Sequence, residues 1–291
     1  MRSWRWSEMT DALTDLHGKI CVVTGASSGI GKEIARNFCR MGATVVIGCR
    51  DRARGDEICR TTAAAPGRAE FEFVDVSRPK SIRAFAASII RRHSQVHVLV
   101  NNAGIWSRKR LETPDGFELT WATNVLGYHV AATSLLPALR VGAPSRIVYV
   151  ASTFVRGVDT ADPEFRRKPY RGIAAYRQSK GADRMLAWAL ARRLAGSGVT
   201  VNAVHPGGVN TGIYREARGW WGALMHAWVR STKLSPEQGA DAPTWIAVAP
   251  LLQDVTGKFF VGRQETACGL RDECREERLW RICEDMSAVT D

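Results

Sequence analysis

The sequence predicts a single α/β domain built on a mostly parallel sheet of about seven strands. Short β-branched runs alternate with segments of helical spacing, and this alternation continues past residue 200 without a linker or a low-complexity tract. The predicted strands are apolar almost throughout, which is typical of a parallel sheet covered by helices on both faces. We therefore expect the 291 residues to form one doubly wound domain with a large core.

The predicted strands are spaced so that a helix fits between successive ones. They cover residues 19–24, 44–48, 70–74, 96–100, 146–150, 200–205 and 257–261. Helical spacing is clearest over residues 31–41, 81–93 and 174–194. This order is that of repeated βαβ units, in which a helix returns the chain to begin the next parallel strand.

The chain divides into three predicted parts. Residues 1–18 form an N-terminal extension, residues 19–262 the domain itself, and residues 263–291 a charged tail with helical character. No segment has the roughly 18 uncharged apolar residues that a membrane-spanning helix needs. We expect a cytoplasmic protein that is either soluble or peripherally associated with a membrane.

The composition is strongly basic. There are 41 Lys+Arg against 29 Asp+Glu, a net charge of +12, and 33 of the basic residues are arginine. Arginine is spread over many segments without a basic stripe or an aromatic recognition motif, so the composition argues against nucleic-acid binding. The seven cysteines lack CxxC or His-rich spacing, which predicts reduced thiols and no metal site.

The first strand runs into the glycine-rich turn Thr24–Gly31 (TGASSGIG), and a helix opens at once. Glycines let the backbone approach a pyrophosphate, and the free amides of a helix N-terminus favour the anion. The spacing is Gly-x3-Gly-x-Gly, but its place directly after the first strand predicts a Rossmann-type dinucleotide site rather than only a tight turn. The candidate cofactor ligands are Gly25, Ser27, Ser28, Gly29, Ile30 and Gly31.

The end of the second strand predicts which cofactor binds. In dinucleotide folds an acidic residue here binds the adenosine ribose and would repel a 2′-phosphate. This chain has Cys49 followed by Arg50, whose guanidinium can clamp that phosphate, so we predict NADP(H) in preference to NAD(H). Asp51 is either a competing ribose ligand or the cap of the next helix. Asp75 and Val76, after the third strand, are candidates for adenine contact, although Asp75 could equally cap a helix.

Six motifs in chain order resemble those of the short-chain dehydrogenase/reductase family, over roughly residues 18–262. They are Thr24–Gly31, Asn101–Gly104 (NNAG), Asn124, Ser152, Tyr176-x3-Lys180 and Pro206–Gly207. The stretches 146–152, 190–206 and 257–260 resemble the retinol dehydrogenase-like branch. The resemblance implies an oxidoreductase that transfers hydride between a nicotinamide and a carbonyl or alcohol.

The predicted chemistry can also be argued from the residues. Tyr176 and Lys180 are four apart on one predicted helix, so both project from the same face. A phenol with a pKa near 10 is a poor catalyst at neutral pH, and a neighbouring ammonium stabilises its phenolate. Tyr176 is therefore a candidate general acid or base. Ser152 ends the fifth strand, where its hydroxyl can donate to the same carbonyl oxygen.

The resemblance implies further roles. Lys180 would also hold the nicotinamide ribose, and Asn124 would keep a water that links Lys180 to solvent. Asn102, Ala103 and Gly104 would line the cofactor or brace the sheet beside it. The remaining cofactor candidates lie around the turn after the sixth strand, facing the nicotinamide carboxamide: Pro206, Gly207, Val209 and Thr211.

Two segments are predicted to surround the substrate. The loop 153–175 is long and basic; its charge is either a solvated face or a site for an acidic substrate group. The flap 211–235 carries three tryptophans over 219–229, which suit a bulky apolar ligand, core packing or a peripheral membrane contact. We expect a retinal-like, steroid-like or secondary-metabolite aldehyde or ketone as substrate.

The sequence leaves open whether the chain is catalytically active and how it assembles. A catalytically idle nucleotide-binding member, acting as a redox sensor or interaction protein, would be favoured by loss of Tyr176 or Lys180, and both residues are present. By resemblance, the chain could form a homodimer or a homotetramer through the helices around Asn124 and Tyr176.

Overall fold

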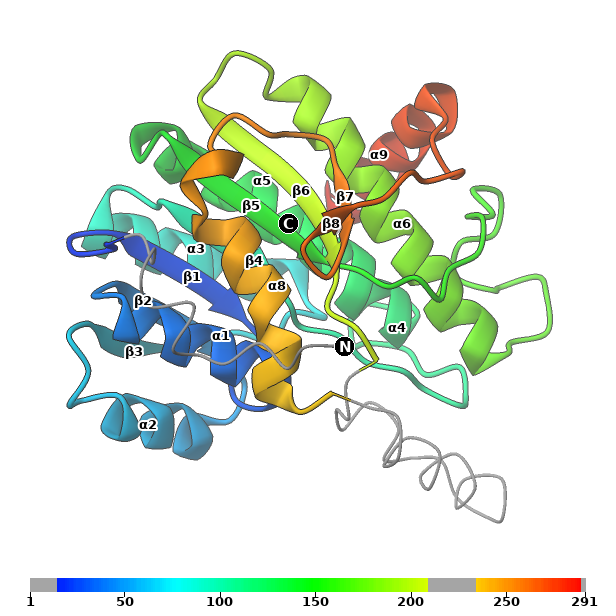
Figure 1. The fold of residues 1–291 in the computed structure, drawn as a ribbon. Coiled ribbons are helices and arrows are strands. Elements are labelled where there is room, and N and C mark those ends of the chain that lie inside the picture. Colours follow the sequence, from blue (N-terminus) through cyan, green and yellow to red (C-terminus); the bar gives the residue numbers. More distant parts are fainter. Residues whose placement is uncertain (1–14, 209–233, 289–291) are drawn as a thin grey trace.

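The computed structural model describes residues 15–208 and 234–288. An eight-stranded sheet runs through the centre with helices packed against both faces, as Figure 1 shows. The strands are β1 (Ile20–Thr24), β2 (Thr44–Cys49), β3 (Arg68–Phe73), β4 (Val98–Asn101), β5 (Ser145–Val150), β6 (Val199–His205), β7 (Phe259–Val261) and β8 (Gln264–Glu265).

The helices follow the strands as the sequence predicts. The principal ones are α1 (Gly29–Arg40), α2 (Arg52–Thr61), α3 (Pro79–His93), α5 (Gly127–Val141), α6 (Gly172–Arg193), α8 (Pro236–Val248) and α9 (Glu273–Ala288). A helical turn α4 (Leu119–Trp121) and a π-helical turn η3 (Ala122–Leu126) lead into α5, and a 3-10 turn η5 (Pro250–Leu252) follows α8.

The strand order is β3-β2-β1-β4-β5-β6-β7-β8. All pairings from β3 to β7 are parallel, and the order reverses between β1 and β4. This is the doubly wound topology, in which ligands bind at the carboxyl ends of the strands beside the reversal. The predicted fold is confirmed. The sequence analysis missed β8, an antiparallel pairing of only two residues with β7, because a segment that short carries no periodic signal.

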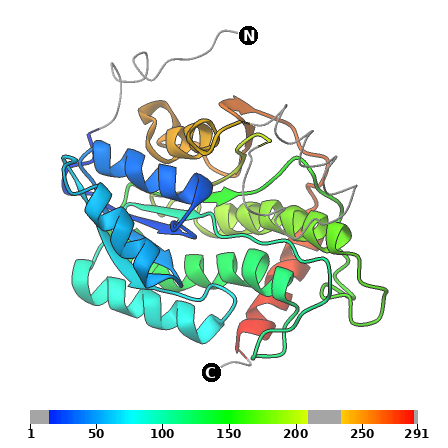
Figure 2. The same cartoon turned by 90° about the horizontal axis from the view of Figure 1, so that it is seen from below.

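Two apolar layers cover the sheet, one on each face. The face under α1 and α8 buries residues such as Val23, Ile34 and Ile246. The opposite face packs against α3, α5 and α6, with α9 over α6, and this side buries the larger cluster of apolar side chains. Figure 2 shows the two helical layers, with blue α1 on one side of the sheet and red α9 on the other. The sheet is therefore buried on both faces, which explains its apolar strands.

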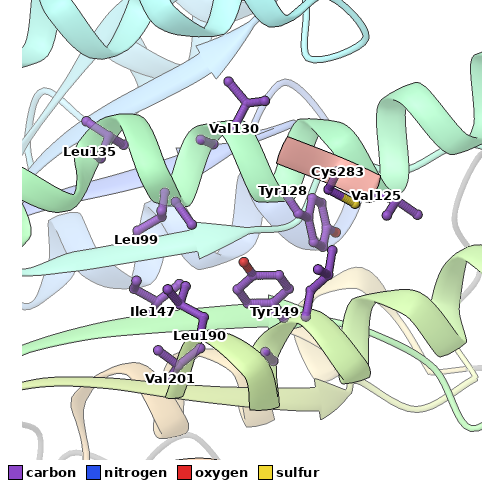
Figure 3. Packing of buried hydrophobic residues seen from close by; sticks show 14 of the residues in the cluster. Leu99, Val125, Tyr128, Val130, Leu135, Ile147, Tyr149, Leu190, Val201 and Cys283 are labelled. Carbon is purple, nitrogen blue, oxygen red and sulfur yellow. The ribbon is translucent and has the colours of Figure 1, made fainter. Parts of the chain in front are cut away.

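A buried tyrosine pair marks the centre of the larger layer. Tyr128 of α5 and Tyr149 of β5 pack edge to face with their ring centroids 5.5 Å apart, as Figure 3 shows. The Tyr128 hydroxyl donates to the Val150 carbonyl at 3.3 Å. This contact ties α5 to the end of β5, two residues before Ser152.

The charged C-terminal segment contributes a packed helix. In α9, Leu279, Trp280 and Cys283 are buried against the rest of the domain. The Trp280 ring meets the His129 ring edge to face at a centroid distance of 4.6 Å, and the Arg193 guanidinium lies 4.2 Å from the Trp280 ring centroid. The predicted helical character of this charged segment agrees with α9, but its packing was not predicted: its apolar stripe covers α6.

Local sequence explains where several helices begin. Pro79 occupies the first turn of α3, where a missing amide hydrogen costs nothing. Ser235 and Gln238 form a reciprocal capping box before α8.

Among the helices of residues 15–208 and 234–288, none is long and apolar enough to cross a bilayer.

Candidate active site

The predicted site residues gather at the carboxyl ends of four adjacent strands. The glycine-rich turn follows β1, Asn102 follows β4, Ser152 follows β5 and Pro206 follows β6. Because β1, β4, β5 and β6 are neighbours in the sheet, these segments share one edge. Segments as far apart in sequence as Gly25 and Pro206 are thereby brought to one crevice, at the reversal of strand order.

The glycine-rich turn is shaped by close backbone contacts that exclude side chains. Gly25 has φ +66°, and a Cβ there would lie 2.7 Å from the Ala103 Cα. A Cβ on Gly31 would lie 2.4 Å from Asn102 Nδ2 and 2.6 Å from the Gly25 carbonyl oxygen. Both positions therefore require glycine. The turn leads straight into α1, whose first amides have no partner within the helix.

A hydrogen-bonded clamp joins the ends of β1 and β4. Thr24 Oγ1 accepts from the backbone amides of Asn102 at 3.1 Å and Ala103 at 3.2 Å. Asn102 Nδ2 donates in return to the carbonyl oxygens of Thr24 at 2.9 Å and Gly25 at 3.3 Å. The Asn102 side chain thus braces the glycine-rich turn, so this part of the NNAG motif has an architectural role.

The end of β2 carries the residues that bear on cofactor choice. Cys49 is buried, and burial raises the pKa of its thiol. A hydrogen bond with Ser27 of the glycine-rich turn lowers this pKa. Arg50 is exposed directly after Cys49. Asp51 caps α2, its carboxylate accepting from the Arg54 amide at 3.1 Å. Of the two readings of Asp51, the helix cap is therefore the one that the geometry supports.

The end of β3 brings Asp75 and Val76 to the same edge. Asp75 Oδ1 accepts from the Ser77 amide at 3.0 Å and from the Ser77 hydroxyl at 2.7 Å. The Asp75 amide donates to Ser81 Oγ at 3.0 Å. The carboxylate therefore shapes the turn into α3, with its second oxygen left for another partner.

Ser152 is held with its hydroxyl hydrogen available. Its Oγ accepts from the Phe154 amide at 3.0 Å, and its carbonyl oxygen accepts from the Arg184 guanidinium. The Arg184 guanidinium also lies 3.5 Å from the Phe259 ring centroid, which anchors it over β7. A hydroxyl that accepts one hydrogen bond can still donate one, so Ser152 can donate to a carbonyl oxygen in the crevice.

Lys180 is buried beneath the same edge of the sheet. It comes from α6, one helical turn after Tyr176. Its Nζ donates to the Val150 carbonyl at 2.9 Å and lies 5.0 Å from the Tyr128 ring centroid. Since Val150 is the last residue of β5, two before Ser152, this bond attaches the Tyr176 face of α6 to the strand end that carries Ser152.

The sequence analysis missed Asp183, the charged partner of Lys180. Asp183 Oδ2 accepts from Lys180 Nζ at 2.8 Å, and the two side chains are 0% and 5% exposed. Asp183 Oδ1 has no hydrogen-bond partner among the described residues. Burial raises the pKa of the Asp183 carboxyl to about 7, and the Lys180 ammonium acts against that rise. The sequence contained a signal for this pair, because residues three apart on a helix are neighbours on its surface.

The Asn124 side chain joins three segments through hydrogen bonds. Its Oδ1 accepts from the Ile105 amide at 2.9 Å, and its Nδ2 donates to the Ile105 carbonyl at 3.0 Å and to Ser179 Oγ at 2.9 Å. It lies in the π-helical turn η3, an irregularity that often occurs at functional sites. A Cβ on Gly104 would lie 3.6 Å from Asn124 Oδ1 and 3.7 Å from Lys180 Nζ, so both residues border the same space.

The turn after β6 completes the described part of the crevice. Gly207 has φ +92°, a left-handed conformation that favours glycine, and follows Pro206. Val209 and Thr211, together with nearly all of the flap 211–235, lie outside the described residues. Within the described part of the chain, no group of three or more His, Cys, Asp or Glu side chains could hold a metal ion.

The chain is similar to known proteins over most of its length. A family model described as short chain dehydrogenase matches residues 19–221. Mouse retinol dehydrogenase 13 is 37% identical over 275 residues, which cover 90% of this chain and 82% of that protein.

Solved structures share the fold. A protein from Mycobacterium paratuberculosis superposes with a TM-score of 0.78 at 29% identity, covering 99% of this chain and 98% of its own. A short chain dehydrogenase from Burkholderia cenocepacia, in complex with NADP, gives a TM-score of 0.68 at 28% identity, covering 85% of this chain and 97% of its own.

The buried carboxyl of Asp183 predicts a pH-dependent stability. An unfolded aspartate has a pKa of about 3.9, whereas burial raises that of Asp183 to about 7. The stability gained from the protonated carboxyl is complete below about pH 4 and is lost as the pH rises through 7. The free energy of unfolding of the wild type, relative to Asp183→Asn, should therefore fall by roughly 1–3 kcal/mol between pH 5 and pH 8.

Urea unfolding of both proteins at the two pH values measures this difference. Asp56→Asn, at an exposed position of α2, is the matched control and should show no such change. A difference between wild type and Asp183→Asn that is constant with pH would show that Asp183 does not titrate in this range.

Proposed function

The chain belongs to the short chain dehydrogenase family, and on that premise we propose that it is an NADP(H)-dependent reductase or dehydrogenase. The family match and the retinol dehydrogenase relative make the chain an oxidoreductase acting on a CH–OH or C=O group. The observation that carries the proposed catalytic arrangement is the bond from Lys180 Nζ to the Val150 carbonyl, 2.9 Å long. It fixes the Tyr176 face of α6 beside the strand end that carries Ser152.

The residues at the glycine-rich turn fit a dinucleotide. The space beside Gly25 and Gly31 is too narrow for a Cβ and leaves backbone amides at the start of α1 for a pyrophosphate. Arg50 is exposed beside this turn, where its guanidinium can pair with a 2′-phosphate. When bound, the nicotinamide would supply or accept the hydride. The NADP complex of the Burkholderia cenocepacia enzyme, similar in fold, supports the same cofactor class.

The protein residues would manage the proton and the carbonyl oxygen. Ser152 donates a hydrogen bond to that oxygen and holds it at the end of β5. Tyr176 gives its proton to the same oxygen in reduction and takes it back in alcohol oxidation. The Lys180 ammonium stabilises the resulting phenolate, because an opposite charge nearby favours the charged form. Asn124 holds the segment that borders Lys180, close to the path by which a proton would return from solvent.

We further propose a bulky, largely apolar aldehyde or ketone as substrate. The name of the mouse relative refers to retinol, and retinal-like or steroid-like compounds remain the substrate class to test first. Peripheral membrane contact through residues 219–229, and assembly into a dimer or tetramer, stay predictions of the sequence analysis. Residues 219–229 lie outside the described part of the chain.

Replacing Tyr176 by phenylalanine should stop turnover without loss of cofactor binding. The variant lacks the proton donor, so kcat should fall by about a hundredfold or more. Its Kd for NADPH, measured by titration of cofactor fluorescence, should stay within about threefold, since the ring itself is kept.

Tyr149→Phe is the matched control for loss of a hydroxyl. The Tyr149 hydroxyl is buried without a hydrogen-bond partner among the described residues, so its removal should leave turnover nearly unchanged. A Tyr176→Phe variant that reduces aldehydes at the wild-type rate would remove Tyr176 from the mechanism.

Cys49→Asp should shift cofactor preference toward NADH. A carboxylate at this position would accept hydrogen bonds from the adenosine ribose and repel a 2′-phosphate. The ratio of kcat/KM for NADPH to that for NADH should fall at least about tenfold, whereas the neutral isostere Cys49→Asn should change the ratio little. Equal ratios for the two variants would mean that the end of β2 does not select the cofactor.

A further inference from the structure

A basic cavity opens beside the first turn of α6. It has a volume of about 580 Å³, and four of its lining residues are arginines, Arg108, Arg156, Arg171 and Arg177. Trp106 and Ile173 contribute an apolar part of the wall. No acidic side chain lines this cavity in the described part of the chain.

The cavity adjoins the proposed catalytic tyrosine. Gly172 and Ile173 lie four and three residues before Tyr176, so they share one face of α6 with it, about one helical turn of ~5.4 Å away. A Cβ on Gly172 would lie 2.1 Å from the Ser107 carbonyl oxygen, which shows how closely α6 approaches the segment after β4. That segment includes Ile105, which Asn124 holds. The cavity wall and the site are therefore built on the same two segments, the stretch after β4 and the first turns of α6.

Most other cations of the 153–175 loop already have partners. Arg166 pairs with Glu164 at 2.9 Å, and Lys168 pairs with Asp159. Asp162 accepts from the backbone amides of Arg166, Arg167 and Lys168. Asp159 and Asp162 line a smaller neighbouring hollow together with Arg156 and Arg171, but their carboxylates bond to Lys168 and to backbone amides within the loop.

Three of the four arginines that line the cavity lack such partners in the described part of the chain. Within residues 15–208 and 234–288, the side chains of Arg108, Arg156 and Arg171 make neither an ion pair nor a hydrogen bond, and all three are exposed. Arg177 donates to the Val155 carbonyl at 3.0 Å and lies over the Phe154 ring, so it is positioned but not neutralised. Four like charges around one small cavity repel each other, and an anion placed among them would relieve that repulsion.

We propose that this cavity binds a carboxylate on the substrate, so that the enzyme acts on carbonyl compounds that carry an acidic group on an apolar body. The inference rests on the proposed function and specifies its substrate class. Guanidinium groups match a carboxylate with paired, charge-assisted hydrogen bonds. Trp106 and Ile173 would cover the apolar body, while the carbonyl reaches Tyr176 and Ser152 about one helical turn further along.

The test compares two aldehydes that differ only in charge. The probes are 4-formylbenzoate and its neutral isostere 4-formylbenzamide, with a longer pair built on 4′-formylbiphenyl-4-carboxylate, each assayed by NADPH consumption. For at least one length, kcat/KM for the acid should exceed that for the amide by about tenfold at low salt, and the difference should shrink as salt rises. The difference in kcat/KM between the acid and the amide should arise mainly from KM.

Charge-removing variants connect the preference to the cavity. In the double variant Arg156→Gln/Arg171→Gln, the acid-to-amide ratio of kcat/KM should fall about tenfold. The double variant Arg91→Gln/Arg140→Gln makes the same charge change at the exposed C-terminal ends of α3 and α5, and should keep the wild-type ratio. Calorimetric titration of 4-formylbenzoate into each protein with NADP bound gives a second readout that needs no turnover.

The outcomes separate this inference from the proposed function. Reduction of both aldehydes without preference for the acid would overturn the inference and leave the reductase function standing. Binding of the acid that the double variant loses, without reduction of either aldehyde, would support the cavity and contradict the function. If the double variant keeps the acid preference but loses binding to phosphatidylserine vesicles, the cavity serves a membrane surface and the inference is wrong.

Discussion

The hydrogen bonds that hold the buried Lys180 ammonium are the interactions on which the rest of the site depends. A cation inside a protein needs partners, because burial without them strongly disfavours the charged form. Here the partners are the Val150 carbonyl at 2.9 Å and the Asp183 carboxylate at 2.8 Å, and the Tyr128 ring covers one side. These contacts hold α6 against the end of β5. Removal of one partner would leave a charge buried and also release the helix that carries Tyr176.

The sheet explains why the remaining groups meet at this cation. Parallel strands end at one edge, and the reversal of order between β1 and β4 opens a crevice there. The Thr24 hydroxyl accepts from two amides across that reversal and fixes the glycine-rich turn relative to the segment after β4. The same segment continues to Ile105, held by Asn124, and to Trp106 at the basic cavity. The glycine-rich turn, the residues proposed to transfer the proton and the basic cavity therefore share a rigid support.

The sequence predicted the fold, the family and the positions of the motifs, because these depend on local patterns. Buried strands, a glycine turn and the four-residue spacing of Tyr176 and Lys180 are visible in the chain itself. The packing of α9 was missed, since it is set by tertiary contacts. Asp183 was missed although its three-residue spacing from Lys180 is visible in the chain, because that spacing does not reveal that both side chains are buried. For the basic loop, the sequence offered a solvated face or an acidic ligand. In the described part of the chain the structure separates the two: Arg166 and Lys168 pair within the loop, whereas Arg108, Arg156 and Arg171 at the cavity make no ion pair.

The most direct measurement of the central role given to Lys180 is the rate of NADPH-dependent aldehyde reduction by Lys180→Met. Methionine is similar in length and apolar, so it fills the buried site without the charge. We expect kcat to fall by about a hundredfold or more, with a circular dichroism spectrum like that of the wild type and with normal turnover in Lys80→Met, an exposed control on α3. A folded Lys180→Met protein that turns over within about threefold of the wild-type rate would contradict the account.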